Sequence, residues 1–226
     1  MKFAVLGTGR VGSTIASKLI ELGHEVMMGS RDPNNDNARS WAEGAGTSAH
    51  HGSFEDAARF GEIVFNCTAG SASLEALQAA GAANLNGKLL VDLANPLDSS
   101  KGMPPSLTVC NEDSLGEQIQ RAFPDVKVVK TLNTVTHVLM VNPSLVPGDH
   151  NLFISGNDAD AKRKVVELLS SFGWPEANVI DLGDISTARG PEMYLPLWLR
   201  LLMQSNFDPH FNIQVQRGAA PADSSP

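Results

Sequence analysis

The chain has 226 residues, of which 42% are hydrophobic and 19% charged, and its formal net charge is −8. These values predict a globular protein, with one large domain or a larger domain plus a small second lobe. A net negative charge without a Lys/Arg cluster argues against a nucleic-acid partner and against an anionic membrane surface. No apolar segment approaches the roughly 20 residues needed to span a bilayer.

The cysteines and histidines also indicate whether the chain can form disulfides or a metal site. The two cysteines, Cys67 and Cys110, lack the spacing of a disulfide framework or a metal site, which favours a reducing compartment. The N-terminus has no signal-peptide pattern, so we expect a cytoplasmic protein. No metal site is expected, because the histidines show no metal-ligand spacing: His24, His50, His51, His137, His150 and His210.

The first half of the chain alternates between short apolar runs and helical periodicity. The predicted strands are Lys2–Leu6, His24–Met28, Ile63–Cys67, Lys88–Leu93 and Val126–Thr131. The predicted helices are Arg10–Leu22, Asn37–Glu43, Ser53–Phe60, Ser71–Ala82 and Ser114–Phe123. Strands separated by helices of this length predict a doubly wound, mainly parallel Rossmann sheet.

The second half is less regular. We expect strands at Asn151–Ser155 and Val179–Leu182, a helix at Asp158–Phe172, and an apolar helical region at Thr187–Met203 interrupted near two prolines. This pattern predicts a small C-terminal α/β lobe. The predicted domains are residues 1–135 (a Rossmann domain), 136–216 (the small lobe) and 217–226 (a disordered tail).

A glycine-rich motif, Gly7-Thr8-Gly9-Arg10-Val11-Gly12, follows the first predicted strand and opens the first helix. In a dinucleotide site the first glycine permits a tight turn, the second admits the diphosphate and the third permits close packing. The helix N-terminus adds unpaired N–H groups and a partial positive charge. The alternative is a tight turn without a ligand.

The second strand is followed by Gly29-Ser30-Arg31-Asp32-Pro33, where an NAD site would carry an acid for the ribose 2′-hydroxyl. The Ser30 hydroxyl and the Arg31 guanidinium suit a 2′-phosphate instead, which predicts NADP(H). Asp32 leaves dual specificity open. Alternatively, Ser30 caps a turn and Arg31 is a solvated surface charge.

Further contacts are expected where later strands end, because these loops line the ligand crevice of such a sheet. Thr68 and Ala69 would lie beside the ribose and nicotinamide, and Asn95 and Asn133 are candidates for the same crevice. For each of these residues the alternative is a turn with only local hydrogen bonds. His137 is the histidine nearest this region, although a structural role is the simpler interpretation of it.

The sequence also resembles the F420-dependent NADP oxidoreductase family. The resemblance is carried by Gly7–Gly12, Gly29–Arg31, Val129–Val135, Ile154–Asp158, Ala188-Arg189 and Leu195–Trp198. It implies that Thr8, Ser30 and Arg31 hold the 2′-phosphate and ribose, although the basic residue that often follows is absent from Asn34–Asn37. A similar module occurs in the cytoplasmic part of membrane metalloreductases, so the fold does not fix the acceptor.

These observations predict an oxidoreductase that transfers hydride between NADPH and F420 or a flavin-like acceptor. Such transfer requires no catalytic side chain, and we expect none. The acceptor pocket would be shaped by His137, Leu195, Pro196 and Trp198, so residues 136–216 would be the acceptor-binding and dimerisation lobe and residues 1–135 the NADP(H)-binding domain. The expected partner is a small-molecule acceptor, and the expected oligomer is a homodimer. The alternatives are a dehydrogenase of the pyrroline-carboxylate, imine or hydroxy-acid type, and a non-catalytic NADP(H)-sensing module.

Overall fold

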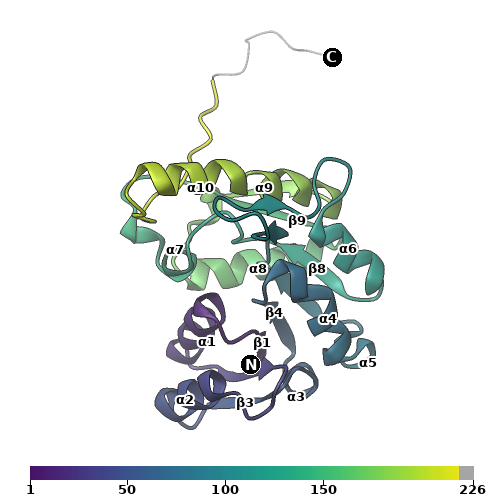
Figure 1. Cartoon of the computed structure of the whole chain (residues 1–226). Coiled ribbons are helices and arrows are strands. Elements are labelled where there is room, and N and C mark those ends of the chain that lie inside the picture. The colour runs from purple at the N-terminus through teal and green to yellow at the C-terminus, as the bar shows by residue number, and fades with distance from the viewer. Residues whose placement is uncertain (219–226) are drawn as a thin grey trace.

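A computed structural model describes residues 1–218, and residues 219–226 of the predicted tail lie outside the described part (Figure 1). The main sheet contains β1 (Lys2–Leu6), β2 (Glu25–Ser30), β3 (Ala49–Ser53), β4 (Ile63–Asn66), β5 (Leu89–Asp92), β8 (Lys127–Lys130), β9 (Leu152–Gly156) and β10 (Val179–Gly183). A separate two-stranded hairpin is formed by β6 (Leu97–Asp98) and β7 (Ser106–Leu107).

Helices connect most of these strands. They are α1 (Arg10–Glu21), α2 (Asp36–Ala45), α3 (Phe54–Phe60), α4 (Gly70–Ala80), α5 (Ala82–Leu85), α6 (Leu115–Ala122), α7 (His137–Val141), α8 (Ala159–Ser171), α9 (Arg189–Met193) and α10 (Leu195–Gln204). Three short 3-10 helices are η1 (Pro143–Leu145), η2 (Glu176–Asn178) and η3 (Ile185–Ala188).

The strand order is β10-β9-β8-β5-β4-β1-β2-β3. From β3 through β8 all neighbouring pairs are parallel, whereas β9 runs antiparallel to β8, and β10 is parallel to β9. The prediction of a doubly wound, mainly parallel Rossmann sheet is therefore confirmed. The chain progresses outward in opposite directions on the two sides of β1 and β4, and a ligand crevice is expected at such a switch point, at the carboxyl ends of the strands.

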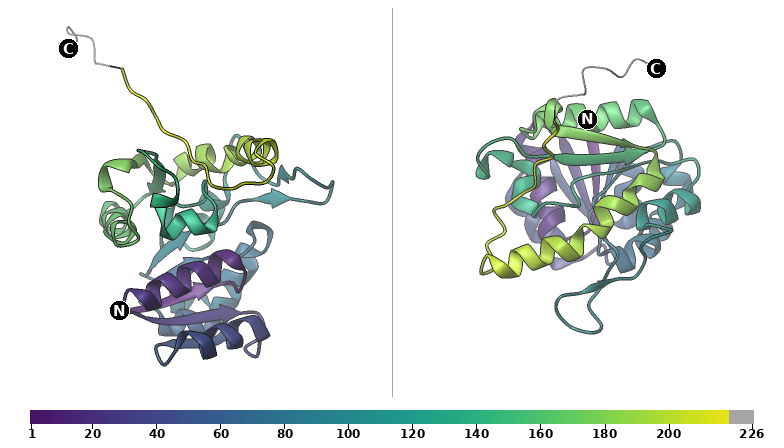
Figure 2. Two further views of the ribbon diagram at one scale, coloured as in Figure 1. Left: turned by 90° about the vertical axis from the view of Figure 1, so that its left-hand side faces the viewer. Right: turned by 90° about the horizontal axis from the view of Figure 1, so that it is seen from above.

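The sheet is covered on both faces, and alternation along each strand divides the core. Phe3 and Val5 of β1 pack into one apolar cluster with Ile15 and Leu19 of α1. Their neighbour Leu6 packs into the other cluster, which includes Leu77 of α4. Successive side chains of a strand point to opposite faces, and the two clusters are the result. Figure 2 shows the helical layers on either side of the sheet.

The C-terminal half continues this sheet. Strand β9 pairs with β8 through Val129 and Lys130, so the predicted C-terminal strands extend the Rossmann sheet. Because β9 is reversed, α8 begins beside the amino end of β8, where Lys127 forms a 2.9 Å ion pair with Asp158. Helices α9 and α10 then run along the opposite side of this half, at the top of Figure 1.

The predicted elements differ from the structure mainly where segments are short or polar. The edge strand β3 was not predicted, because the sequence Ala-His-His-Gly-Ser has no apolar run. Helix α5 and the β6–β7 hairpin were also missed, and each strand of that hairpin has only two residues. The predicted N-cap at Ser53 is confirmed, since Ser53 and Asp56 form a capping box at the start of α3.

Candidate functional site

The glycine motif forms a tight connection between β1 and α1. Gly7 has φ +116°, a conformation that disfavours other residues, and a Cβ there would lie 2.6 Å from the Cys67 carbonyl oxygen. A Cβ on Gly12 would lie 2.0 Å from the Gly7 carbonyl oxygen. Both glycines are therefore required by close approach within the protein itself.

Gly9 differs from these two glycines. An added Cβ at Gly9 would meet no atom of the described chain within 4 Å, so packing within the protein gives no reason for this glycine. Gly9 is also the N-cap of α1, and within the described residues no side chain caps the start of this helix with a hydrogen bond. The exposed first-turn N–H groups and the open space in front of them fit a diphosphate.

A cavity of about 250 Å³ lies on one side of this loop. Its lining joins the glycine loop, the residue after β2, the start of α3 and one face of α4: Gly7, Thr8, Gly9, Arg31, Phe54, Cys67, Thr68, Ala69, Ala72, Glu75, Ala76 and Ala79. The small alanine side chains of α4 leave room for a flat group. The position after β2 corresponds to the adenosine side of a Rossmann site.

Ser30 and Arg31 differ in how freely they can meet a ligand. Ser30 is buried, and its hydroxyl donates a hydrogen bond to the Asp32 carbonyl oxygen, as the turn interpretation expected. The Arg31 side chain is 77% exposed, and its Nε lies 4.0 Å from Oε1 of Glu75. Arg31 therefore presents an accessible cation to the cavity.

A second cavity, of about 530 Å³, lies on the other side of the loop. It is lined by Val11, Cys67, Thr68, Ala69, Gly70, Ser71, Leu93, Ala94, Asn95, Leu97, Asp98, Ser99 and Thr108. The segment Cys67–Ala69 lines both cavities, so the two meet at the carboxyl end of β4. The structure thus places Thr68, Ala69 and Asn95 together in one crevice, with the β6–β7 hairpin as its outer wall.

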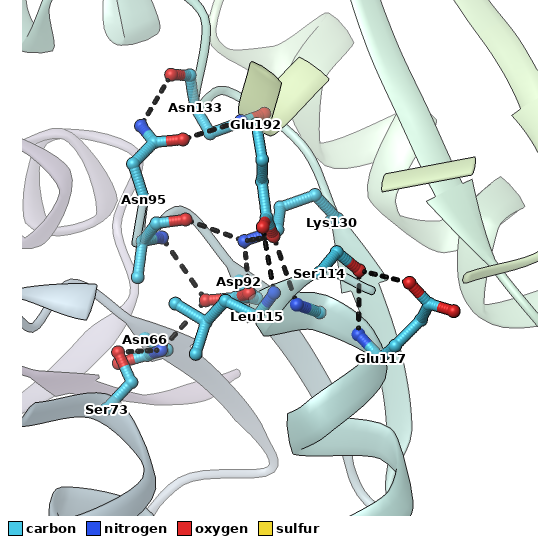
Figure 3. A network of polar contacts seen from close by, with 12 residues as sticks. Asn66, Ser73, Asp92, Asn95, Ser114, Leu115, Glu117, Lys130, Asn133 and Glu192 are labelled. Atoms are coloured by element: carbon cyan, nitrogen blue, oxygen red, sulfur yellow. Dashed lines mark hydrogen bonds and ion pairs between the residues drawn. The ribbon is translucent and has the colours of Figure 1, made fainter. Parts of the chain in front are cut away.

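Asn95 and Asn133 are held against each other. The Asn95 side-chain amide donates to the Asn133 carbonyl oxygen at 2.8 Å, and the Asn133 amide donates to Asn95 Oδ1 at 2.9 Å (Figure 3). Leu132 precedes Asn133 with φ 62°, a strained conformation for a residue other than glycine. Asn133 therefore fixes Asn95, which itself lines the cavity.

Beneath this crevice lies a buried ionic network (Figure 3). The Lys130 ammonium contacts Asp92 at 2.6 Å and Glu192 at 2.9 Å, and donates to the Ala94 carbonyl oxygen at 2.6 Å. Burial opposes the charged form of Lys130, but the two carboxylates outweigh it and raise the pKa of this amine. Lys130 therefore remains cationic and joins β5 and β8 to α9.

The same network extends to both sides. Asn66 donates to Asp92 at 2.8 Å, and the Thr68 hydroxyl donates to Asn66 at 2.7 Å, which links the network to the cavity wall. At the other end the Glu192 carboxylate accepts hydrogen bonds from the backbone N–H groups of Leu115 and Gly116, at the start of α6. A negative charge at a helix N-terminus is stabilising.

The four predicted acceptor-pocket residues lie on α7 and α10. His137 Nδ1 lies 2.9 Å from the Thr14 hydroxyl of α1, and burial together with the nearby Arg10 lowers the pKa of this histidine. Leu195 is buried, Pro196 is exposed, and Trp198 stacks on Phe211 with ring centroids 5.4 Å apart. Their role in acceptor binding stays a prediction.

Comparison with known proteins places this chain in a family. Residues 2–96 match the family described as NADP oxidoreductase, coenzyme F420-dependent. A crystal structure of a candidate F420-dependent NADP reductase from Arthrobacter sp. FB24 shares 53% identity, with a TM-score of 0.91, over 96% of this chain and 100% of that chain. The chain belongs to the F420-dependent NADP oxidoreductase family. The resemblance inferred from the motifs is thereby confirmed.

Two curated relatives of this family member differ in length. The F420-dependent NADP reductase of Methanocaldococcus jannaschii is 28% identical over 89% of this chain and 92% of the relative. Metalloreductase STEAP3 of Rattus norvegicus is 28% identical over 87% of this chain, which spans only 38% of that relative. Within residues 1–218, the helices are too short or too polar to cross a bilayer.

Several parts of the site were not found from the sequence. Asp92 and Glu192 carry no motif signal of their own, and their pairing with Lys130 depends on contacts between residues up to 62 positions apart in the sequence. The hairpin that forms the outer wall was missed because each of its strands has only two residues. Lys130 lies within the Val129–Val135 motif, which is a sequence signal for this residue, but the motif does not indicate that the lysine is buried.

Proposed function

We propose that this protein is an NADP(H)-dependent oxidoreductase that transfers hydride between NADPH and a deazaflavin of the F420 type, or a flavin-like acceptor. The observation that supports it best is the pair of cavities that meet at Cys67–Ala69, directly in front of an open helix N-terminus. A dinucleotide can extend across that junction, with its diphosphate at the glycine loop. Membership of the family favours this function over the pyrroline-carboxylate and imine types.

The residues of the chain would divide the binding between them. The first-turn N–H groups of α1 would hold the diphosphate, and Arg31 would bind the 2′-phosphate as a charged hydrogen-bond donor. Ser30 would first have to exchange its bond to Asp32 for one to the phosphate. When bound, the nicotinamide ring supplies or receives the hydride.

The second cavity would bind the nicotinamide and the acceptor. Leu93, Ala94 and Leu97 offer apolar surface that excludes water, and Thr68 and Asn95 offer hydrogen-bonding groups. Positioning two rings in a dry site is sufficient for hydride transfer, so no acid or base from the chain is required. The buried network around Lys130 keeps the wall of this cavity in place.

We further propose a homodimer and a cytoplasmic location. Leu197 and Leu201 of α10 are 56% and 37% exposed, and a contiguous apolar helix face of this kind suits a subunit interface. Sedimentation of the purified protein tests the oligomeric state.

The function is tested by turnover. Purified protein is incubated with NADPH and, in separate reactions, with F420, FMN or FAD, while absorbance of the reduced nicotinamide is followed. Loss of that absorbance with F420 or a flavin is expected. Tight NADPH binding without turnover by any of the three would contradict the reductase proposal and favour an NADP(H)-sensing role.

A further inference from the structure

A carboxylate faces the arginine that would bind the 2′-phosphate. Glu75 lies on α4, and both Glu75 and Arg31 line the smaller cavity. The Arg31 Nε and the Glu75 Oε1 are 4.0 Å apart, and the Glu75 side chain is 73% exposed. The pair therefore stands in the solvent-filled mouth of the adenosine side of the site.

Glu75 makes no evident contribution to the packing of its helix. The buried residues of α4 are Ser73, Ala76, Leu77 and Ala80, and Glu75 is not among them. Within the described chain, Arg31 is the ionic partner found for Glu75. A glutamate that packs nothing and contacts the ligand-binding cation has its principal effect on the charge of the cavity.

The charges in this cavity almost cancel. Its lining holds one cation, Arg31, and one anion, Glu75, while the remaining lining side chains are uncharged. The adjoining loop adds Asp32, whose Oδ1 accepts a hydrogen bond from the Asn34 N–H, and it carries no lysine through Asn37. A 2′-phosphate entering here meets one cation that is already shared with a carboxylate.

We infer that Glu75 is a specificity-determining residue that limits the preference of this site for NADP(H) over NAD(H). The carboxylate competes with the 2′-phosphate for Arg31 and repels it directly. NAD(H) has a hydroxyl at that position and leaves the Arg31–Glu75 pair intact, so Glu75 does not oppose its binding. This inference rests on the proposed NADP(H) binding at the glycine loop.

The test is Glu75→Gln, which removes the charge and keeps the shape. Dissociation constants for NADPH and NADH are measured by fluorescence titration at low and high ionic strength. Exposed ion pairs contribute at most about 1 kcal/mol, so we expect NADPH to bind about 2- to 5-fold more tightly to E75Q than to the unmodified protein. NADH affinity should change less than about 2-fold, and the gain should diminish in high salt because exposed charges are screened.

A matched control is Glu55→Gln. Glu55 is an exposed glutamate on α3 that pairs with Arg59, and neither residue lines the cavity. E55Q should leave the affinities for both cofactors unchanged. Glu75→Lys should increase the NADPH preference further than E75Q, since it replaces the anion beside Arg31 with a second cation.

Each remaining outcome counts against one claim. Unchanged NADPH affinity in E75Q, or an equal gain for both cofactors, would overturn the role of Glu75 while leaving the proposed function intact. Weaker NADH binding in E75Q together with unchanged NADPH binding would mean that Glu75 accepts a hydrogen bond from the NADH ribose instead of competing with the 2′-phosphate for Arg31, and would also overturn it. Failure of the unmodified protein to bind NADPH would instead remove the proposed function.

Discussion

Replacing Lys130 by Met should strongly destabilise the protein. The Lys130 ammonium contacts two carboxylates, Asp92 at 2.6 Å and Glu192 at 2.9 Å, and all three side chains are at most 1% exposed. Met preserves much of the length of the side chain but leaves both carboxylates buried without their cation. Breaking a buried ion pair in this way costs about 3–5 kcal/mol.

That loss can be measured in two ways. For a chain of this size, each kcal/mol corresponds to roughly 2–4 °C, so the midpoint of thermal unfolding should fall by about 6–20 °C. Urea unfolding followed by circular dichroism should give a matching decrease in the free energy of unfolding. The control is Lys127→Met on the same strand, whose pair with Asp158 is exposed and contributes at most about 1 kcal/mol.

The pH dependence gives an independent check. Because the folded-state pKa of Lys130 is raised, its contribution is complete below the unfolded value of about 10.4 and disappears only as the pH rises through the higher folded value. The stability difference between the unmodified protein and K130M should therefore be constant from pH 7 to pH 9.

Equal stability losses in K130M and K127M would refute the interpretation of the network.

Three further predictions follow from the site and the surface. Arg31→Ala should weaken NADPH binding by about 10-fold or more in fluorescence titrations, because one charged hydrogen bond contributes roughly 1.5–3 kcal/mol. NADH binding should be nearly unchanged, and equal losses of affinity for both cofactors would argue against a 2′-phosphate contact. Gly9→Ala should fold with unchanged thermal stability yet bind NADPH poorly. Gly12→Ala should lose thermal stability as well, since its Cβ would lie 2.0 Å from a backbone oxygen. Similar melting curves for both variants would contradict the expected difference in stability. The hydrogen bond from Arg121 lowers the pKa of Asp113 to about 2, so its stabilisation is complete above the unfolded value of about 4 and is lost as the pH falls from 4 to 2. Asp113→Asn should therefore cost about 1 kcal/mol at pH 7 in urea unfolding, with the difference closing near pH 2, and a gap that persists at pH 2 would exclude this cause.

Much of the nucleotide half could be predicted from local sequence. The short apolar runs of β1, β4, β5 and β8 are almost entirely buried, and α1 carries apolar residues at helical spacing, of which Ile15 and Leu19 are buried. The position of the glycine motif then determines the place of the crevice. These features depend on residues near one another in the chain, which is why periodicity and motif spacing could identify them.

The remainder depends on contacts between distant segments. Nothing in the sequence of β9 indicates that it runs antiparallel to β8 in the same sheet, since either direction buries the same side chains. The ionic network requires Lys130 of β8 to meet Glu192 of α9, and Glu75 acquires its partner only when α4 lies opposite the end of β2. Periodicity carries no information on such pairings.

The reversed direction of β9 separates the anion-attracting ends of two helices. Helix α8 begins beside the amino end of β8, so its positive N-terminal end lies at the amino ends of the parallel strands. The N-terminal end of α1 lies at their carboxyl ends. Asp158 serves as the N-cap of α8 and accepts a hydrogen bond from the Ala161 N–H at 2.8 Å. The anion position of α8 is thus already filled by a carboxylate of the protein, whereas that of α1 is left to a ligand. Helix polarity therefore favours an anionic ligand at the carboxyl ends of the parallel strands, where the two cavities meet.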